Sequence, residues 1–298
     1  MNGMFFFRRA LIALLLLASA CRPAPAPSTQ DADPALWVVR DADTTIYLFG
    51  TIHVLKPGLS WFDEAVRTAF DSSDTLVLET VIPDPATMQA LVRELGTDPS
   101  APPLRQRIPP DMARQLETTL AEEKMPANRF DSMDPWLAAT TLATLEVSRL
   151  GYAREQGAEE TLRAAAQAEG KRVAGLETPR QQLGYFDSLS PEAQQALLAA
   201  TLNERGDAGT MLGRIVDAWS KGDAGALGGL VNADVSQSPE LSRTLLVDRN
   251  ARWAQWIAAR MQRPGTVFVA VGAGHLAGKD SVQAMLARQG ITVQRVAY

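Results

Sequence analysis

Four short apolar runs constrain the fold of this chain more strongly than any other feature. They lie within residues 36–50, 75–79, 171–179 and 266–275 and are rich in Val, Ile, Leu and Phe. Short apolar runs bounded by turn residues are typical of buried strands. Helical stretches separate the runs, and this alternation favours parallel strand pairing. We therefore expect an α/β (α+β) fold with a partly parallel central sheet.

The segments around these runs predict the remaining elements. Apolar and polar residues alternate on both sides of residues 41–43, which predicts an N-terminal hairpin. A helix is predicted over residues 60–73, with Ser60 as its N-cap. Residues 85–262 are mostly helical in pattern and are predicted to form an insertion that packs as a lobe over one side of the sheet. Residues 279–296 supply a closing helix and strand.

The N-terminus has the pattern of a secretory signal peptide over residues 1–20. A basic Arg8-Arg9 pair precedes an apolar stretch and the small residues before Cys21. The apolar stretch is shorter than the roughly 20 residues that cross a bilayer. Cys21 is the only cysteine, and its setting resembles a bacterial lipobox, so a lipid on Cys21 is the one membrane contact that the sequence predicts. We expect a periplasmic protein of the bacterial cell envelope, either free or anchored as a lipoprotein.

The composition after the signal peptide excludes several function classes. Residues 21–35 are Pro, Ala and polar residues, which predicts a flexible tether before a single domain over 36–298. Removing Arg8 and Arg9 leaves 27 basic and 34 acidic residues, and a net charge of 27 − 34 = −7 argues against nucleic-acid binding. No cysteine follows Cys21, so disulfides, cysteine-ligated zinc and cysteine nucleophiles are excluded from the domain.

The only two histidines of the chain share one local pattern. Each stands three residues after a glycine that ends an apolar run, in Gly50-Thr51-Ile52-His53 and Gly272-Ala273-Gly274-His275. A lone histidine is more often a hydrogen-bonded structural residue. Glycine fills only 21 of 298 positions, however, so its place before both histidines is improbable by chance. We interpret the repeated pattern as one functional site.

Two glutamates complete this site at the ends of neighbouring runs. Glu79 follows the second run and Glu177 the third. Ligands of α/β sheets bind outside the carboxyl ends of the strands, where these side chains are expected to meet. His53, His275 and Glu79 are predicted to bind a divalent metal ion, namely zinc, manganese, cobalt or iron, with Glu177 as general base. The roles of the two glutamates are interchangeable at this point.

A helix predicted over residues 245–262 carries two further candidates, Arg249 and Asn250. Asn250 lies on the same helical face as Trp253 and Ile257, so its amide is expected to point inward and to need partners. Asn250 is either a strut of the helix, a donor to a substrate carbonyl, or a support for a metal ligand. Trp253 is interpreted as core packing.

The segments YLFGTIHVL, LVLET, GLETPRQQLGYFDSL, LLVDRN and VAVGAGHLAGKDSV together resemble the TraB/GumN family, which is related to the Tiki metalloproteases. The resemblance extends from Leu36 to Val296. It implies a metal-dependent, peptidase-like site, in which His53 and His275 match the two motif histidines and Glu79 matches the acidic residue after the second strand. The resemblance does not identify the substrate, and the expected peptide or protein substrate belongs to the hydrolase hypothesis.

The leading hypothesis is a metal-dependent hydrolase of the cell envelope that acts on peptide or amide bonds. One alternative is an envelope protein that binds haem or a metal without turnover. Another is an accessory factor in polysaccharide or plasmid-transfer systems. No sequence feature sets the oligomeric state.

Overall fold

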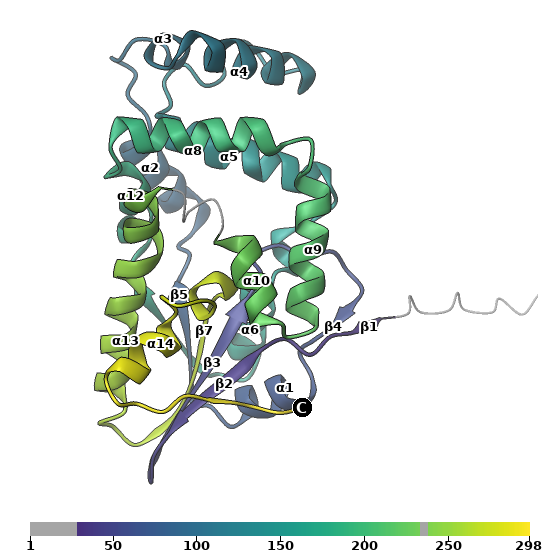
Figure 1. Ribbon diagram of the computed structural model, residues 1–298, viewed down its shortest axis with the longest axis vertical. Coiled ribbons are helices and arrows are strands. Elements are labelled where there is room, and N and C mark those ends of the chain that lie inside the picture. Colours follow the sequence, from purple (N-terminus) through teal and green to yellow (C-terminus); the bar gives the residue numbers. More distant parts are fainter. Residues whose placement is uncertain (1–28, 233–237) are drawn as a thin grey trace, which may run out of the picture.

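The centre of the computed structural model is a six-stranded mixed sheet with the order β6-β5-β7-β3-β2-β8 (Figure 1). The structure describes residues 29–232 and 238–298, so the predicted signal peptide and Cys21 lie outside the described residues. The strands of the sheet are β2 (Leu36–Arg40), β3 (Thr44–Thr51), β5 (Thr75–Thr80), β6 (Arg172–Glu177), β7 (Gly265–Gly272) and β8 (Gln294–Arg295). Strands β3, β7, β5 and β6 pair in parallel. The predicted α/β fold with a partly parallel sheet is confirmed.

The predicted N-terminal hairpin is present and joins the antiparallel part of the sheet to its parallel part. Strand β2 pairs antiparallel with both β3 and β8. The Asp41 backbone NH donates to the Thr44 carbonyl at 3.0 Å, and the Asp41 carboxylate accepts from the Thr44 NH at 2.8 Å. An aspartate that bonds the backbone of its own turn is a common device in tight turns.

Helices cover both faces of the sheet (Figure 1). The helices of the first face are α1 (Glu64–Asp71), α6 (Ala158–Ala168), α9 (Ala208–Ser220) and α10 (Ala224–Val231). Those of the second face are α13 (Asp248–Arg260) and α14 (Val282–Arg288). Phe49 and Phe268 point to the first face, and Val77 and Val269 to the second. Strands buried on both faces need almost continuous apolar sequence, which explains the runs of β3, β5 and β7, whereas the edge strand β6 is largely exposed.

The other helices form a lobe at one end of the sheet (Figure 1). They are α2 (Pro85–Gly96), α3 (Leu104–Arg107), α4 (Pro110–Glu122), α5 (Pro135–Arg149), α7 (Pro179–Asp187), α8 (Pro191–Glu204) and α12 (Pro239–Ser242). All but α3 begin with proline. Proline is well suited to this position, because the NH that it lacks would have no partner within the first turn of the helix. A separate apolar cluster around Phe130 and Leu142 holds α3, α4, α5 and α8 together. Within 85–262, strand β6 and helices α6, α9, α10 and α13 belong to the sheet layers instead.

Ser60 is not a helix N-cap, and that prediction is wrong. Helix α1 begins at Glu64, while Ser60 belongs to the short strand β4 (Leu59–Ser60). The Ser60 carbonyl accepts a hydrogen bond from the Ala32 NH at 2.9 Å, and the Ser60 hydroxyl donates to Asp63. Backbone pairing with a distant segment therefore extends the chain where local propensity favours a helix.

The end of the predicted tether belongs to the fold. Strand β1 (Gln30–Asp31) pairs in parallel with β4, and Ala32 is buried. The Asp33 NH donates to the Ser220 carbonyl at 2.7 Å. Small alanines and backbone bonds thus secure a segment whose composition offers little to bury. Across the described residues, no helix has the length and apolarity to cross a membrane.

Candidate functional site

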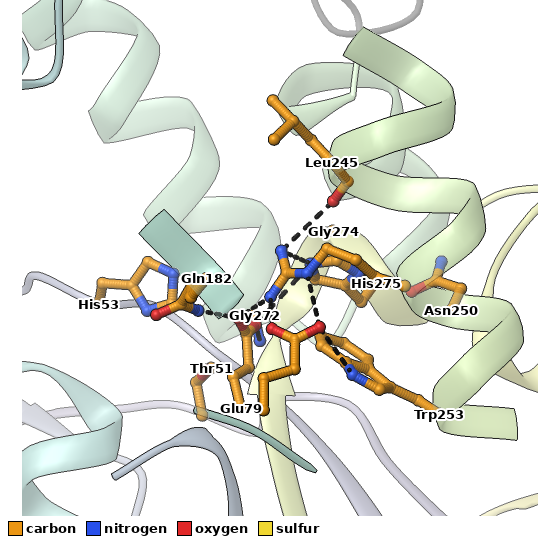
Figure 2. A network of polar contacts seen from close by, with 12 residues as sticks. Thr51, His53, Glu79, Gln182, Leu245, Asn250, Trp253, Gly272, Gly274 and His275 are labelled. Atoms are coloured by element: carbon orange, nitrogen blue, oxygen red, sulfur yellow. Dashed lines mark hydrogen bonds and ion pairs between the residues drawn. The ribbon is translucent and has the colours of Figure 1, made fainter. Parts of the chain in front are cut away.

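The carboxyl ends of the parallel strands bring the predicted site residues to one edge of the sheet. Glu79 and Glu177 stand near the ends of β5 and β6, and His53 follows β3. Strand β7 ends at Gly272 and is shorter than predicted. His275 therefore lies in the 3-10 turn Ala273–Leu276 that follows the strand. Figure 2 shows His53 and His275 on either side of Glu79.

Arg249 of α13 links these groups through its guanidinium. Its Nη2 donates to Glu79 Oε2 at 2.7 Å and to Glu177 Oε2 at 2.8 Å. Its Nε donates to Glu177 Oε1 at 3.0 Å, and its Nη1 lies 3.2 Å from His275 Nε2. Arg249 is only 7% exposed. A planar guanidinium has five donors in a fixed plane, whereas an ammonium group has three, so only arginine can make the five bonds donated here.

Aromatic side chains enclose the Arg249 guanidinium. Its Cζ lies 4.7 Å from the ring centroid of Trp253 and 5.4 Å from that of Tyr185. The Trp253 indole NH and the Tyr185 hydroxyl donate to Glu177 Oε1 at 3.1 and 3.2 Å. Trp253 packs in the core as predicted, and its polar edge also belongs to the site. Glu177 is therefore held by three different side chains.

A π-helical turn precedes Arg249. The π-helix Arg243–Val247 joins α12 to α13, and the Leu245 carbonyl in it accepts from Arg249 Nη1 at 3.3 Å (Figure 2). Single π-turns inside helical segments are frequent at functional sites. Here the turn gives the guanidinium a backbone acceptor from its own helix.

Glu79 accepts hydrogen bonds on both carboxylate oxygens. The Gly272 NH donates to Oε1 at 2.7 Å, and Gln182 of α7 donates to Oε2 at 3.0 Å. Burial alone would raise the pKa of Glu79, but His275, Arg249 and His53 lower it to about 2. Glu79 is therefore a carboxylate at neutral pH.

His275 is oriented by Asn250. Its Nδ1 lies 2.6 Å from Asn250 Oδ1, while Asn250 Nδ2 donates to the Asp280 carbonyl at 2.8 Å. An amide oxygen only accepts, so the proton of His275 is on Nδ1 and the lone pair is on Nε2. That lone pair faces Arg249, and Nε2 is 3.8 Å from Glu79 Oε1. Burial lowers the pKa of His275 to about 4, which keeps the ring neutral at pH 7.

His53 has an equivalent arrangement with a residue that the sequence did not point to, Glu159. His53 Nδ1 is 2.5 Å from Glu159 Oε1, which also accepts from the Thr51 hydroxyl at 2.5 Å. The Glu159 carboxylate raises the pKa of His53 above its ordinary value. The His53 side chain is 67% exposed, so solvent screens part of this interaction.

Helix α6 brings Glu159 to His53 through a close backbone approach. A Cβ on Gly157, which precedes α6, would lie 2.1 Å from the His53 carbonyl oxygen. The Ala158 NH donates to the Ile52 carbonyl at 3.0 Å. The glycine just before the acidic first turn of this helix is the only sequence signal of the contact.

Gly272 leaves room for the side chains of Glu79 and His53. A Cβ at Gly272 would lie 3.0 Å from Glu79 Oε1 and 3.5 Å from His53 Nε2. His53 Nε2 and Glu79 Oε1 therefore border the same small space, and His275 Nε2 approaches the same oxygen of Glu79. The second G-x-x-H motif thus has a steric reason for its first glycine.

The donor atoms suit a divalent metal ion, but Arg249 competes for them. The second ring nitrogen of a metal-binding histidine usually bonds a carboxylate or carbonyl oxygen, and Nδ1 of His53 and of His275 does so here. Among the described residues, no group of three His, Cys, Asp or Glu side chains is arranged so that it could hold a metal ion. Arg249 bonds both Glu79 and His275, so a metal at these donors must displace it.

The other predicted residues take more limited positions. Within the described residues, Glu177 has no hydrogen bond or ion pair to either histidine and bonds Arg249, Trp253 and Tyr185. The amide nitrogen of Asn250 is already bonded, which favours its role as a support for His275. Gln182 and Tyr185 were not predicted. They lie three residues apart on α7, whose Thr178–Gln181 capping box fixes the helix start directly after β6.

Comparisons with known proteins identify the family. The uncharacterized protein YbaP of Escherichia coli is 25% identical over 253 residues, which cover 85% of this chain and 92% of YbaP. An uncharacterized protein of Treponema pallidum is 23% identical over 265 residues, covering 83% and 78%. The zebrafish metalloprotease TIKI2 is 25% identical over 326 residues, covering 90% of this chain and 62% of TIKI2. No solved structure matches. The model of the TraB/PrgY/gumN family matches residues 35–295, and the chain therefore belongs to this family.

Proposed function

We propose that the protein is a metal-dependent hydrolase of the bacterial cell envelope that acts on peptide or amide bonds. One observation carries the proposal. His53 and His275 each have Nδ1 held by an oxygen acceptor and Nε2 on the side of Glu79. The similarity to a protein named as a metalloprotease supports the same reaction class. Residues 1–21 support secretion, with or without a lipid on Cys21.

In this proposal, His53, His275 and Glu79 hold the metal, which would be zinc, manganese, cobalt or iron. A bound metal supplies an acidified water and polarises a carbonyl. Glu79 suits the ligand role better than Glu177, because it alone of the two lies beside a histidine nitrogen. The bonds that Glu177 accepts from Arg249, Trp253 and Tyr185 instead favour a positioning role over the role of general base.

Arg249 gives the proposed site its electrophilic group. It is buried and stays cationic at all relevant pH values, so it can stabilise negative charge that develops on a substrate carbonyl oxygen. Its bond to His275 is one of five that it donates, so it can leave the imidazole and still be held by Glu177.

Metal analysis of the mature protein, purified without a histidine tag, tests the proposal directly. We expect near-stoichiometric metal in the unaltered chain and loss of it in His53→Ala and His275→Ala. Hydrolysis of a fluorogenic peptide library should disappear in the same two variants. Glu122→Gln, an exposed change on α4, serves as control. The proposal is wrong if no ion binds after each has been added back, or if both histidine variants keep metal and activity.

A further inference from the structure

Strand β6 leaves an open edge beside the candidate site. We use the name β6 edge for Arg172–Glu177 together with Val81 and Ile82. In the described part of the chain, strand β6 is the last strand of the sheet and pairs with β5 alone. The opposite edge strand, β8, has only two residues, so it offers almost no backbone to a partner.

The faces of β6 are partly covered, and its outer side is free. Val173 packs in the apolar cluster of one face and Leu176 in that of the other. Arg172, Ala174 and Gly175 are exposed. Within the described residues, the backbone of β6 has no hydrogen bond outside its pairing with β5. Alternate residues of such a strand direct an unpaired NH and carbonyl outward.

Two exposed apolar side chains lie next to this free backbone. Val81 is 39% and Ile82 37% exposed, and they directly follow β5. A Cβ on Gly175 would lie 3.3 Å from the Val81 nitrogen, which places this segment over the face of β6 at Gly175, where side chains of an added strand would also lie. Neighbouring exposed apolar side chains often mark a surface that a binding partner covers. Here two such side chains adjoin an unpaired strand.

We propose that the β6 edge binds the substrate as an added strand, with apolar side chains of an extended peptide against Val81 and Ile82. Only an extended polypeptide presents NH and carbonyl groups at the spacing of a strand edge. Edges are usually protected by charged side chains, proline or bulges, whereas the centre of β6 is Ala174-Gly175. The centre of the strand therefore carries no charged or bulky side chain of the kind that blocks an added strand.

The continuity of β6 with the site argues for a substrate. Glu177, the last residue of the strand, bonds Arg249, and Glu79 lies only two residues before Val81. A peptide paired with β6 therefore has one end near the carboxyl ends of the parallel strands, which is where the histidines lie. This inference rests on the proposed hydrolase function, and it adds the substrate form: an extended peptide segment with apolar residues.

Fluorescence anisotropy with a labelled, capped peptide of alternating Val and Thr between terminal lysines tests the docking step. The full mature chain with His53→Ala is used, so that the probe is not cleaved and docking is measured apart from metal binding. We expect saturable binding. N-methylation of one set of alternate amides should weaken it about tenfold or more, since several hydrogen bonds are lost, and methylation of the other set should not.

Matched surface variants locate the probe. Val81→Asp and Ile82→Asp should weaken binding about tenfold, because a carboxylate replaces apolar contact. Met211→Asp on α9, where the native side chain is 40% exposed, should bind as the parent does. The inference is overturned by absence of saturable binding, by equal tolerance of both methylated sets, or by Val81→Asp matching the control. It is also overturned if sedimentation shows that a second copy of the chain covers this edge in a dimer that Val81→Asp dissociates.

Discussion

At the scale of single residues, Glu159 determines how His53 presents its Nε2. Glu159→Gln keeps the shape but removes the charge that raises the His53 pKa. We expect the His53 pKa to fall and the metal affinity to drop roughly 10- to 100-fold, as is usual when such a partner is lost. NMR titration resolves this well, because the chain has two histidines. Glu160→Gln, which affects the surface pair with Arg163, should change neither quantity. An unchanged His53 pKa in Glu159→Gln would contradict the assignment.

The two histidines should affect stability with opposite signs as pH falls. The pKa of His275 is lowered from 6.5 to about 4, so its contribution is present above pH 6.5 and is lost as pH falls toward 4. The pKa of His53 is raised, so its contribution is present below pH 6.5 and is lost at higher pH.

Urea unfolding of the metal-free protein measures this difference. Between pH 7 and 5, the stability advantage of the parent over His275→Asn should shrink by about 2 kcal/mol. Its advantage over His53→Asn should grow instead. If the stability difference from the parent changed in the same direction with pH for both variants, the two imidazoles would not occupy these distinct environments.

Arg249 should act as the cation of the metal-free site. Arg249→Met leaves Glu79 and Glu177 buried without their shared partner, which typically costs about 3–5 kcal/mol. Because the substitution also frees His275, we expect zinc to bind this variant more tightly than the parent and to restore most of the lost stability. Thermal unfolding with and without zinc measures both effects. Zinc affinity at or below that of the parent would refute the competition between guanidinium and metal.

At the scale of elements, the start of α6 must dock tightly on the loop after β3. Gly157→Ala would put a methyl carbon 2.1 Å from the His53 carbonyl oxygen, so backbone must shift. We expect a loss of several kcal/mol in the free energy of unfolding and a displaced His53–Glu159 pair. Gly184→Ala on α7, with open space at its Cβ, should be neutral or slightly stabilising. Denaturant unfolding of the two variants decides the matter, and equal stabilities would exclude the close approach.

The elements also show what sequence can predict. The apolar runs identify β3, β5 and β7, because each is buried on both faces, and they identify β6 through Val173 and Leu176, which pack on opposite faces of this more exposed strand. Proline at the first helical position marks most of the lobe helices. The exact ends are set by tertiary contacts instead. Ser60 pairs with the strand of Gln30–Asp31, and His275 turns away after Gly272 to meet Asn250.

At the scale of the whole molecule, the site joins the sheet to both covering layers. His53, Glu79 and His275 follow from the strand pattern alone, because parallel strands end at one edge. Glu159 comes from a helix on the opposite face of the sheet from α13, which carries Arg249. His53 and Glu159 are 106 positions apart, and the glycine before α6 does not by itself indicate which residue the helix approaches, so the sequence did not reveal the contact.

This arrangement predicts which parts of the molecule respond to metal. The apolar cluster of α3, α4, α5 and α8 shares no side chain with the clusters on the two faces of the sheet. Bound zinc should therefore slow amide hydrogen exchange at the start of α6, in the turn after β7 and along α13, and leave α4 unchanged. His275→Ala should abolish the protection. Protection spread evenly over α4 and the sheet would mean that lobe and sheet open as one unit, and a response confined to the lobe would place the metal elsewhere.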